Sequence, residues 1–270
     1  MKNGKSLENK YQKLKKLLLD IGSGVIAFSG GKDSGLLAKV AYEVLGKNIF
    51  AVTAYSPTYP SWENKDSSKI AREIGISHLI IHTEEFKDNK FIRNHTDRCY
   101  WCKRELFSKI RKIADKKGNK YILDGTNFDD KDDIRPGLKA NKEFSVRSPL
   151  YECKFRSQDI QDLARRLGLS FWDKPSGTCL SSRIPFGQEI SLGRIKKVGE
   201  AEMFLRGFFG PKVLFRARDH GDLLRIEVAN WEWTKMRKSD ITKIVRKLKE
   251  IGYKYVTLDL EGYIPAGKRQ

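Results

Sequence analysis

Short apolar segments alternate with amphipathic ones through the first half of the chain, and this alternation limits the fold more than any other feature. The run 24–28 is continuously apolar, which is typical of a strand buried on both faces, and three further strands are expected at 49–54, 78–82 and 121–124. Apolar residues recur at helical spacing before, between and after these runs: 10–20, 35–45, 65–74, 100–117 and 159–167. Strands that alternate with helices form a parallel sheet covered on both faces. The sequence therefore predicts an α/β fold with a doubly wound parallel sheet.

The last third of the chain has a different order of elements. Two helices and three strands are expected there, the first two strands forming an antiparallel hairpin: 195–208, 213–218, 223–228, 240–251 and 254–258. This order predicts a smaller carboxyl-terminal α+β domain. We place the first domain at residues 1–187 and the second, for substrate binding or oligomerisation, at residues 188–270.

The chain carries 53 Lys and Arg against 34 Asp and Glu, a formal net charge of +19 over 270 residues. The excess is spread evenly, because residues 1–150 hold 29 basic and 19 acidic side chains and residues 151–270 hold 24 and 15. Such an excess favours an anionic partner, either a nucleic acid or a nucleotide, but it forms no basic tail. No run approaches the roughly 20 apolar residues that cross a bilayer, so we expect no membrane association.

The amino terminus is charged and lacks the apolar core of a signal peptide, so we expect a cytoplasmic protein. Thiols stay reduced in that compartment, which makes the four cysteines candidate ligands or catalysts. Cys99 and Cys102 form a CxxC pair, and Cys179 lies far along the chain. Three thiolates could hold three irons of a [4Fe–4S] cluster and leave the fourth iron open, whereas a structural zinc would want four ligands. We expect Cys153 to be an ordinary cysteine rather than that fourth ligand.

The segment SGGKDS at 29–34 lies directly between an expected strand and an expected helix. Its two glycines allow a tight turn that brings backbone N–H groups against an anion. The helix that follows directs its positive end to the same place. Ser29 and Ser34 add hydroxyl donors, and Asp33 can hold Mg²⁺ against phosphate oxygens. The segment therefore predicts a phosphate-binding loop.

This loop resembles the SGGxDS signature of the PP-loop ATP pyrophosphatases, which cleave ATP between the α and β phosphates and adenylate a carboxylate or a carbonyl oxygen of a base. The resemblance implies an adenine nucleotide α-hydrolase-like fold. It also implies that five residues hold pyrophosphate and its Mg²⁺: Ser29, Gly30, Gly31, Asp33 and Ser34. Ser56 and Gly125 would lie near the adenosine. Arg135 and Lys139, after the fourth expected strand, are candidates to neutralise charge on ATP or on the adenylate.

Several further segments resemble the LarE family in the same order: LDGTN (123–127), RPGLKA (135–140), RSPL (147–150), CLSSRIPFG (179–187), FRARDHGDLLRIEV (215–228) and YVTLDL (255–260). These proteins are sulfur transferases that install thiocarboxylates on a pyridinium mononucleotide, a precursor of the nickel-pincer cofactor. Members with a single cysteine near the position of Cys179 give up that sulfur and keep dehydroalanine. Members that also have a CxxC are implied to use a [4Fe–4S] cluster and external sulfide. Cys99, Cys102 and Cys179 would then be both the cluster ligands and the catalytic residues.

The same resemblance assigns the carboxyl-terminal part of the chain to substrate binding. Arg216 and Arg218 alternate on one expected strand, so both side chains should point to one face. Two guanidiniums there suit a substrate phosphate, and Ser182 and Arg183 would complete the pocket beside Cys179.

The sequence therefore predicts an ATP-dependent sulfur transferase that uses ATP, Mg²⁺ and a [4Fe–4S] cluster. Its partners would be a phosphorylated carboxylate and a sulfide or sulfur-donor protein, and we expect a homo-oligomer. Two alternatives stay open. One is a [4Fe–4S]-dependent tRNA thiolase with the same adenylation chemistry, which the positive charge would suit. The other is an amidotransferase-type ligase or a nucleotide-binding module with a structural metal.

Overall fold

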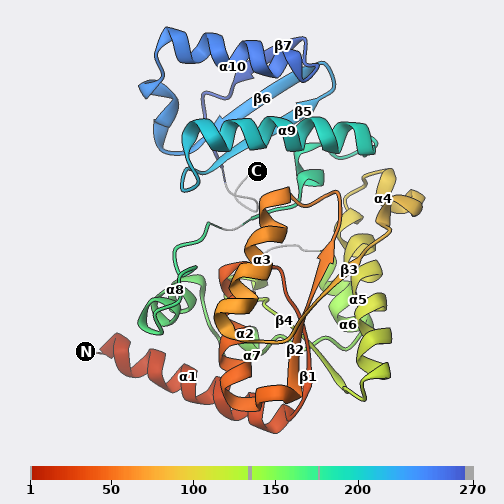
Figure 1. The fold of residues 1–270 in the computed structure, drawn as a ribbon, viewed down its shortest axis with the longest axis vertical. Coiled ribbons are helices and arrows are strands. Elements are labelled where there is room, and N and C mark those ends of the chain that lie inside the picture. The colour runs from red at the N-terminus through yellow and green to blue at the C-terminus, as the bar shows by residue number, and fades with distance from the viewer. Residues whose placement is uncertain (1, 133–135, 176, 265–270) are drawn as a thin grey trace. The chain divides into compact units, whose positions relative to one another are not determined.

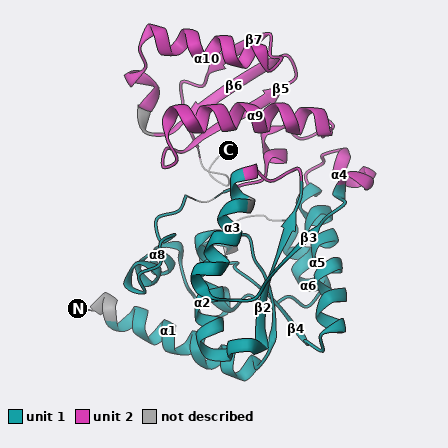
Figure 2. Cartoon of the chain, in the orientation of Figure 1, with its two compact units in different colours: residues 1–56, 62–85, 97–177 teal, residues 57–61, 86–96, 178–270 magenta. Residues whose placement is uncertain are grey.

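The computed structural model describes residues 2–132, 136–175 and 177–264 (Figure 1). By its internal contacts the chain divides into two compact units, coloured separately in Figure 2. The first unit consists of residues 1–56, 62–85 and 97–177, and the second of residues 57–61, 86–96 and 178–270. In the described part of the chain, no helix has the length and apolar character needed to cross a membrane.

The first unit is built on a four-stranded sheet in the order β3-β2-β1-β4, with every neighbouring pair parallel. Its strands are β1 (Gly24–Ala27), β2 (Ile49–Tyr55), β3 (His78–His82) and β4 (Tyr121–Asp124). The four expected strands and their parallel arrangement are confirmed. Because parallel strands end at the same edge, the loops after β1 and β4 emerge side by side, where open α/β sheets bind ligands.

Helices cover both faces of this sheet, which confirms the doubly wound prediction. They are α1 (Lys2–Ile21), α2 (Lys32–Leu45), α3 (Ser61–Ile74), α5 (Arg98–Lys116), α6 (Gly137–Glu143), α7 (Pro149–Glu152) and α8 (Ser157–Arg166). Successive residues of β1 point to opposite faces. Ile26 packs in a core with residues of α1, α2, α3 and α8, whereas Val25 packs in a second core with residues of α5 and α6.

The second unit contains a three-stranded sheet in the order β5-β6-β7. β5 (Phe215–His220) and β6 (Leu223–Val228) form the expected antiparallel hairpin, and β7 (Tyr255–Leu258) joins β6 in parallel. Apolar residues of β5 and β6 form one core with α9 (Leu192–Phe209) and α10 (Lys238–Glu250). A short helix, α4 (Asn89–Ile92), also belongs to this unit. The predicted α+β arrangement is confirmed.

By their contacts, residues 178–187 belong to the second unit, whereas the sequence predicted that the second domain begins after residue 187. Hydrogen bonds give the physical reason. Leu180 N donates to Thr58 O at 2.6 Å, and Asn94 Nδ2 donates to Pro185 O at 2.8 Å. This segment is thus held by the stretches after β2 and β3, which join the second unit with it. A division of the chain into independently folding domains at residue 187 stays a prediction.

Candidate active site

The SGGKDS loop joins β1 to α2, and Gly31 is the last residue before the helix. Ser29 Oγ lies 3.0 Å from Ser34 Oγ and accepts a hydrogen bond from Gly31 N at 3.2 Å, so the loop closes on itself. The residue at the amino end of α2 contributes no side-chain cap, because it is a glycine. The first N–H groups of a helix have no partners within the helix, so they are available to an anion. The loop therefore has the features of a phosphate cradle.

Two glycines allow close approach to this loop. Gly30 has a φ of +70°, and a Cβ there would lie 2.6 Å from Ser67 Cα in α3. Gly125 follows β4, and a Cβ there would lie 2.7 Å from the backbone nitrogen of Ser34. Both contacts are with backbone or near-backbone atoms, so neither position has room for a side chain. Gly125 thus packs against the phosphate loop itself, and its contact with adenosine stays a prediction.

The carboxylate of Asp33 lies in the first turn of α2, where the helix dipole favours a negative charge. Asn127 Nδ2 donates to Asp33 Oδ2 at 3.1 Å. The orientation of this amide is determined, because its Oδ1 accepts from Asp129 N at 2.9 Å. Asn127 therefore sets the direction of the carboxylate that the sequence assigned to Mg²⁺. Asn127 is the last residue of the LDGTN segment that resembles the LarE family, but the sequence predicted no role for this residue.

Lys174 ties the phosphate loop to α3. Its Nζ donates to Gly30 O at 3.0 Å and forms ion pairs with Glu63 and Asp66, each at 2.9 Å. The side chain of Lys174 is only 14% exposed, so the three contacts hold it in place. The lysine and the glycine are 144 residues apart, and no local pattern pointed to this contact.

The other residues that were predicted to contact the nucleotide differ in their burial and in their hydrogen bonds. Ser56 follows β2, is buried, and donates its hydroxyl hydrogen bond to Glu85. Lys139 is an exposed residue of α6. Arg135 lies outside the described residues. Their predicted contacts with ATP stay predictions.

The four cysteines have distinct environments. Cys99 and Cys102 lie three residues apart near the start of α5, so their side chains share one side of the helix; Cys99 is exposed and Cys102 half-buried. Cys179 is half-buried and precedes the 3₁₀ turn Leu180–Arg183 of the second unit. Cys153 lies in the core of the first unit, and burial raises the pKa of its thiol to about 11.

These environments fit thiolate ligation at three of the four cysteines. A thiol that is open to solvent can bind a soft metal, whereas Cys153 is packed in the core and is unsuited to be a fourth ligand. Cys99 and Cys102 belong to the first unit and Cys179 to the second. Among the residues that the structure describes, no group of three or more His, Cys, Asp or Glu side chains is gathered to hold a metal ion. The cluster and the Mg²⁺ therefore stay predictions.

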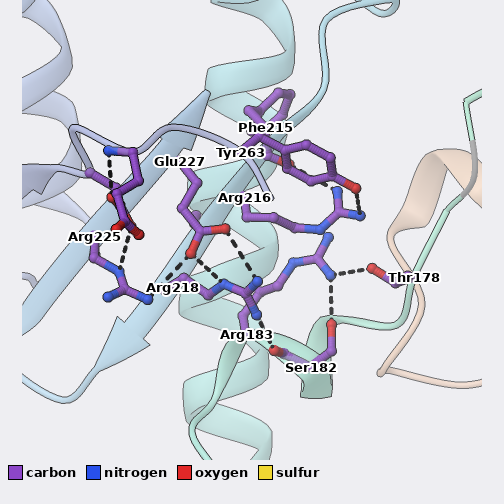
Figure 3. Close-up of polar contacts among 12 residues, drawn as sticks. Thr178, Ser182, Arg183, Phe215, Arg216, Arg218, Arg225, Glu227 and Tyr263 are labelled. Carbon is purple, nitrogen blue, oxygen red and sulfur yellow. Dashed lines mark hydrogen bonds and ion pairs between the residues drawn. The ribbon is translucent and has the colours of Figure 1, made fainter. Parts of the chain in front are cut away.

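The three arginines that the sequence assigned to substrate binding lie together in the second unit (Figure 3). Arg183 forms a bidentate pair with Glu202 at 2.6 and 2.9 Å, and Arg218 forms one with Glu227 at 2.8 and 3.2 Å. Both glutamates are buried. Burial acts to lower the pKa of Arg183, but Glu202 outweighs this effect and holds that pKa above its ordinary value.

The same arginines hold the segment that carries Cys179. Arg183 Nη1 donates to Thr178 Oγ1 at 2.5 Å, to Ser182 Oγ at 2.7 Å and to Cys179 O at 3.3 Å. Arg218 Nη1 donates to Ser182 O at 2.7 Å. The predicted substrate residues of the second unit are thus brought together, with Cys179 at their border.

Arg216 differs from its two neighbours. It is 9% exposed, yet no carboxylate among the described residues pairs with it. Its Nη1 donates to Phe215 O at 2.9 Å, and its Nη2 donates to Tyr263 Oη at 3.0 Å. Burial, together with the charges of Arg183 and Arg218, lowers the pKa of Arg216 to about 10. Among the described residues, the charge of this guanidinium is therefore not neutralised by an ion pair.

No protein-family model matches the chain. An uncharacterized protein of Synechocystis sp. is 40% identical over 95% of this chain and 96% of its own. An uncharacterized protein of Methanocaldococcus jannaschii is 33% identical over 88% of this chain and 90% of its own. The pyridinium-3,5-bisthiocarboxylic acid mononucleotide synthase of Lactiplantibacillus plantarum is 35% identical over 96% of this chain and 93% of its own. This similarity over nearly the full length of both chains confirms the resemblance seen in the sequence, and the chain belongs to the LarE family.

Proposed function

We propose that this protein is an ATP-dependent sulfur transferase that adenylates a carboxyl group of a pyridinium mononucleotide and replaces an oxygen by sulfur, in the synthesis of the nickel-pincer cofactor. The observation that carries the proposal is the phosphate cradle at SGGKDS, in a chain 35% identical to a synthase of a bisthiocarboxylic acid mononucleotide. A thiocarboxylic product implies the corresponding carboxylic acid as substrate. Adenylation of that acid requires a nucleotide site of this kind.

The loop would divide the binding of Mg·ATP among its groups. The hydroxyls of Ser29 and Ser34 and the first N–H groups of α2 would face the phosphates. Asp33 would hold Mg²⁺, which neutralises developing charge as pyrophosphate leaves. The remaining proposed contacts with the nucleotide are those of Gly30, Gly31, Ser56, Gly125, Arg135 and Lys139.

The reaction would proceed in two displacements. An oxygen of the substrate carboxylate attacks the α-phosphorus of ATP, the bond to the bridging oxygen breaks, and pyrophosphate leaves. A sulfur nucleophile then attacks the acyl carbon of the adenylate, the bond to the AMP oxygen breaks, and AMP and the thiocarboxylate are released. A thiolate or hydrosulfide is already a strong nucleophile near neutral pH, so the second displacement needs no general base.

Two sources of sulfur are compatible with the accessible thiols. The Cys179 thiolate can attack the acyl carbon itself, after which β-elimination breaks its Cβ–S bond and leaves dehydroalanine. In the second case Cys99, Cys102 and Cys179 would hold a [4Fe–4S] cluster, which when bound supplies an open iron that carries exogenous hydrosulfide. We favour the second source, because a sacrificed Cys179 has no need of the CxxC pair on α5.

The arginine cluster would hold the phosphate of the substrate. Arg216 supplies a positive charge without a carboxylate partner among the described residues. Ser182 accepts from Arg218 through its carbonyl oxygen and donates from its hydroxyl to Cys179 O. A phosphate bound there would anchor the mononucleotide in the part of the chain that carries Cys179.

A single-turnover experiment tests this function. Protein reconstituted anaerobically with iron and sulfide is mixed with ATP and pyridinium-3,5-biscarboxylic acid mononucleotide, and pyrophosphate, product and intact protein mass are measured. We expect pyrophosphate and a thiocarboxylate, with the protein mass unchanged; loss of the mass of H₂S would identify Cys179 as the donor. Asp33→Asn should slow pyrophosphate release by about 100-fold or more, because charge stabilisation at the metal is lost. Cys179→Ala should release pyrophosphate without forming thiocarboxylate.

The matched control is Cys153→Ala, which should keep both activities because Cys153 is a core residue. Sulfur transfer to tRNA but not to the mononucleotide would overturn the proposed substrate and favour a tRNA thiolase. If no pyrophosphate is released with the mononucleotide and none is released with tRNA, the proposed adenylation is wrong.

A further inference from the structure

The arginine cluster includes a side chain to which the sequence gave no role. Tyr263 follows β7, and its N–H donates to Val228 O at 3.1 Å, so the segment after β7 lies along the end of β6. Gly262 makes this approach possible, because its φ is +73° and a Cβ there would lie 2.8 Å from Val228 O. The backbone around Tyr263 is therefore held in a defined place next to the cluster.

Tyr263 covers the arginine that lacks a carboxylate partner (Figure 3). Arg216 Nη2 donates to Tyr263 Oη at 3.0 Å, and the guanidinium carbon lies 4.8 Å from the centre of the phenol ring. A guanidinium that stacks on an aromatic ring is limited in its rotation. Because Tyr263 Oη accepts from Arg216, the phenol proton points elsewhere, and no described residue accepts it.

The pairing of charges shows which groups of the cluster are left for a ligand. Arg183 and Arg218 already donate two hydrogen bonds each to a buried glutamate. Arg216 is buried with neutral partners, the Phe215 carbonyl and the Tyr263 hydroxyl. Within the described ranges, a cation without a carboxylate partner and an O–H donor without an acceptor thus lie side by side, a donor set that suits a phosphate monoester.

We propose that Tyr263 is a substrate-binding residue: its hydroxyl donates to the phosphate of the mononucleotide while its ring keeps the Arg216 guanidinium in the plane that faces that phosphate. This inference rests on the proposed function, since it takes the arginine cluster as the phosphate site. Arg183 and Arg218 then act as positioning residues for the Cys179 segment.

Two commercially accessible probes isolate the phosphate: nicotinic acid mononucleotide and the matching riboside, which lacks the phosphate. Isothermal titration calorimetry gives a Kd for each, and their ratio measures the preference for the phosphate. Tyr263→Phe should lower this preference by about 10-fold, because a hydrogen bond to a charged group is lost. Tyr263→Leu should lower it further, because stacking on Arg216 is lost as well.

The matched control is Tyr255→Phe, which removes the hydroxyl of a tyrosine that is 63% exposed on β7 and should leave the preference unchanged. Arg216→Gln distinguishes a missing Tyr263 contact from a missing phosphate site. If Arg216→Gln abolishes the preference while Tyr263→Phe retains it in full, Tyr263 is not a ligand although the phosphate site stands. If Arg216→Gln also retains the preference, the phosphate does not bind at this cluster, and that part of the proposed function is wrong.

Discussion

Asn127 orients the carboxylate of Asp33 without adding a charge of its own. A neutral donor to a carboxylate that binds a metal fixes the direction of that carboxylate, so loss of the donor should weaken the proposed metal site. We expect Asn127→Ala to raise the dissociation constant for Mn²⁺, measured by electron paramagnetic resonance with a non-hydrolysable ATP analogue, by about 10-fold. The matched control is Asn119→Ala, since the Asn119 amide donates to the nearby Lys117 carbonyl in the turn before β4. Equal Mn²⁺ affinity in wild type and Asn127→Ala would show that Asp33 is oriented without this amide.

At the scale of secondary-structure elements, the phosphate loop depends on the approach of the residue after β4 to the start of α2. Gly125→Ala would place a Cβ 2.7 Å from the Ser34 nitrogen, so the backbone of one of the two segments must move. Because a backbone shift of about 1 Å is enough to misplace reacting groups, the rate of pyrophosphate release should fall by about 100-fold. The control is Gly207→Ala in α9, where an added Cβ has no neighbour within 4 Å and should stabilise the helix by about 0.5–1 kcal/mol. Thermal unfolding and the rate of pyrophosphate release of both variants check this, and an unchanged rate of release in Gly125→Ala would contradict it.

The elements themselves were predictable to different degrees. Strands β1 to β4 and the longer helices could be predicted, because apolar runs mark the strands and helical periodicity marks the helices in the sequence itself. The short helices α4, α6 and α7 contain four, seven and four residues, which is too few to show a period of 3.6. Helix α2 begins at Lys32, three residues earlier than its apolar pattern, because polar loop residues form its first turn.

At the scale of the whole molecule, the proposed cluster requires the thiols of Cys99, Cys102 and Cys179. Anaerobic reconstitution should give a brown, oxygen-sensitive chromophore, since Fe–S clusters are held by cysteine thiolates. The triple variant Cys99→Ala/Cys102→Ala/Cys179→Ala should remain colourless and contain no stoichiometric iron. Cys153→Ala should keep the chromophore, because the pKa of Cys153, raised to about 11 by burial, keeps that thiol protonated. Colour in the triple variant, or zinc in place of iron in the wild type, would overturn the cluster.

The sequence by itself determined the parallel sheet, the SGGKDS turn between β1 and α2, the hairpin of the second unit and the family, because each depends on local periodicity or on a contiguous motif. Only the tertiary structure decided which side chains support those motifs. Asn127 meets Asp33 across 94 positions, Lys174 meets Gly30 across 144, and Tyr263 meets Arg216 across 47. It also decided that Arg183 and Arg218 are paired with glutamates and that Arg216 has no carboxylate partner among the described residues. These outcomes depend on which charged groups folding buries together, and the spacing of residues along one chain carries no record of that.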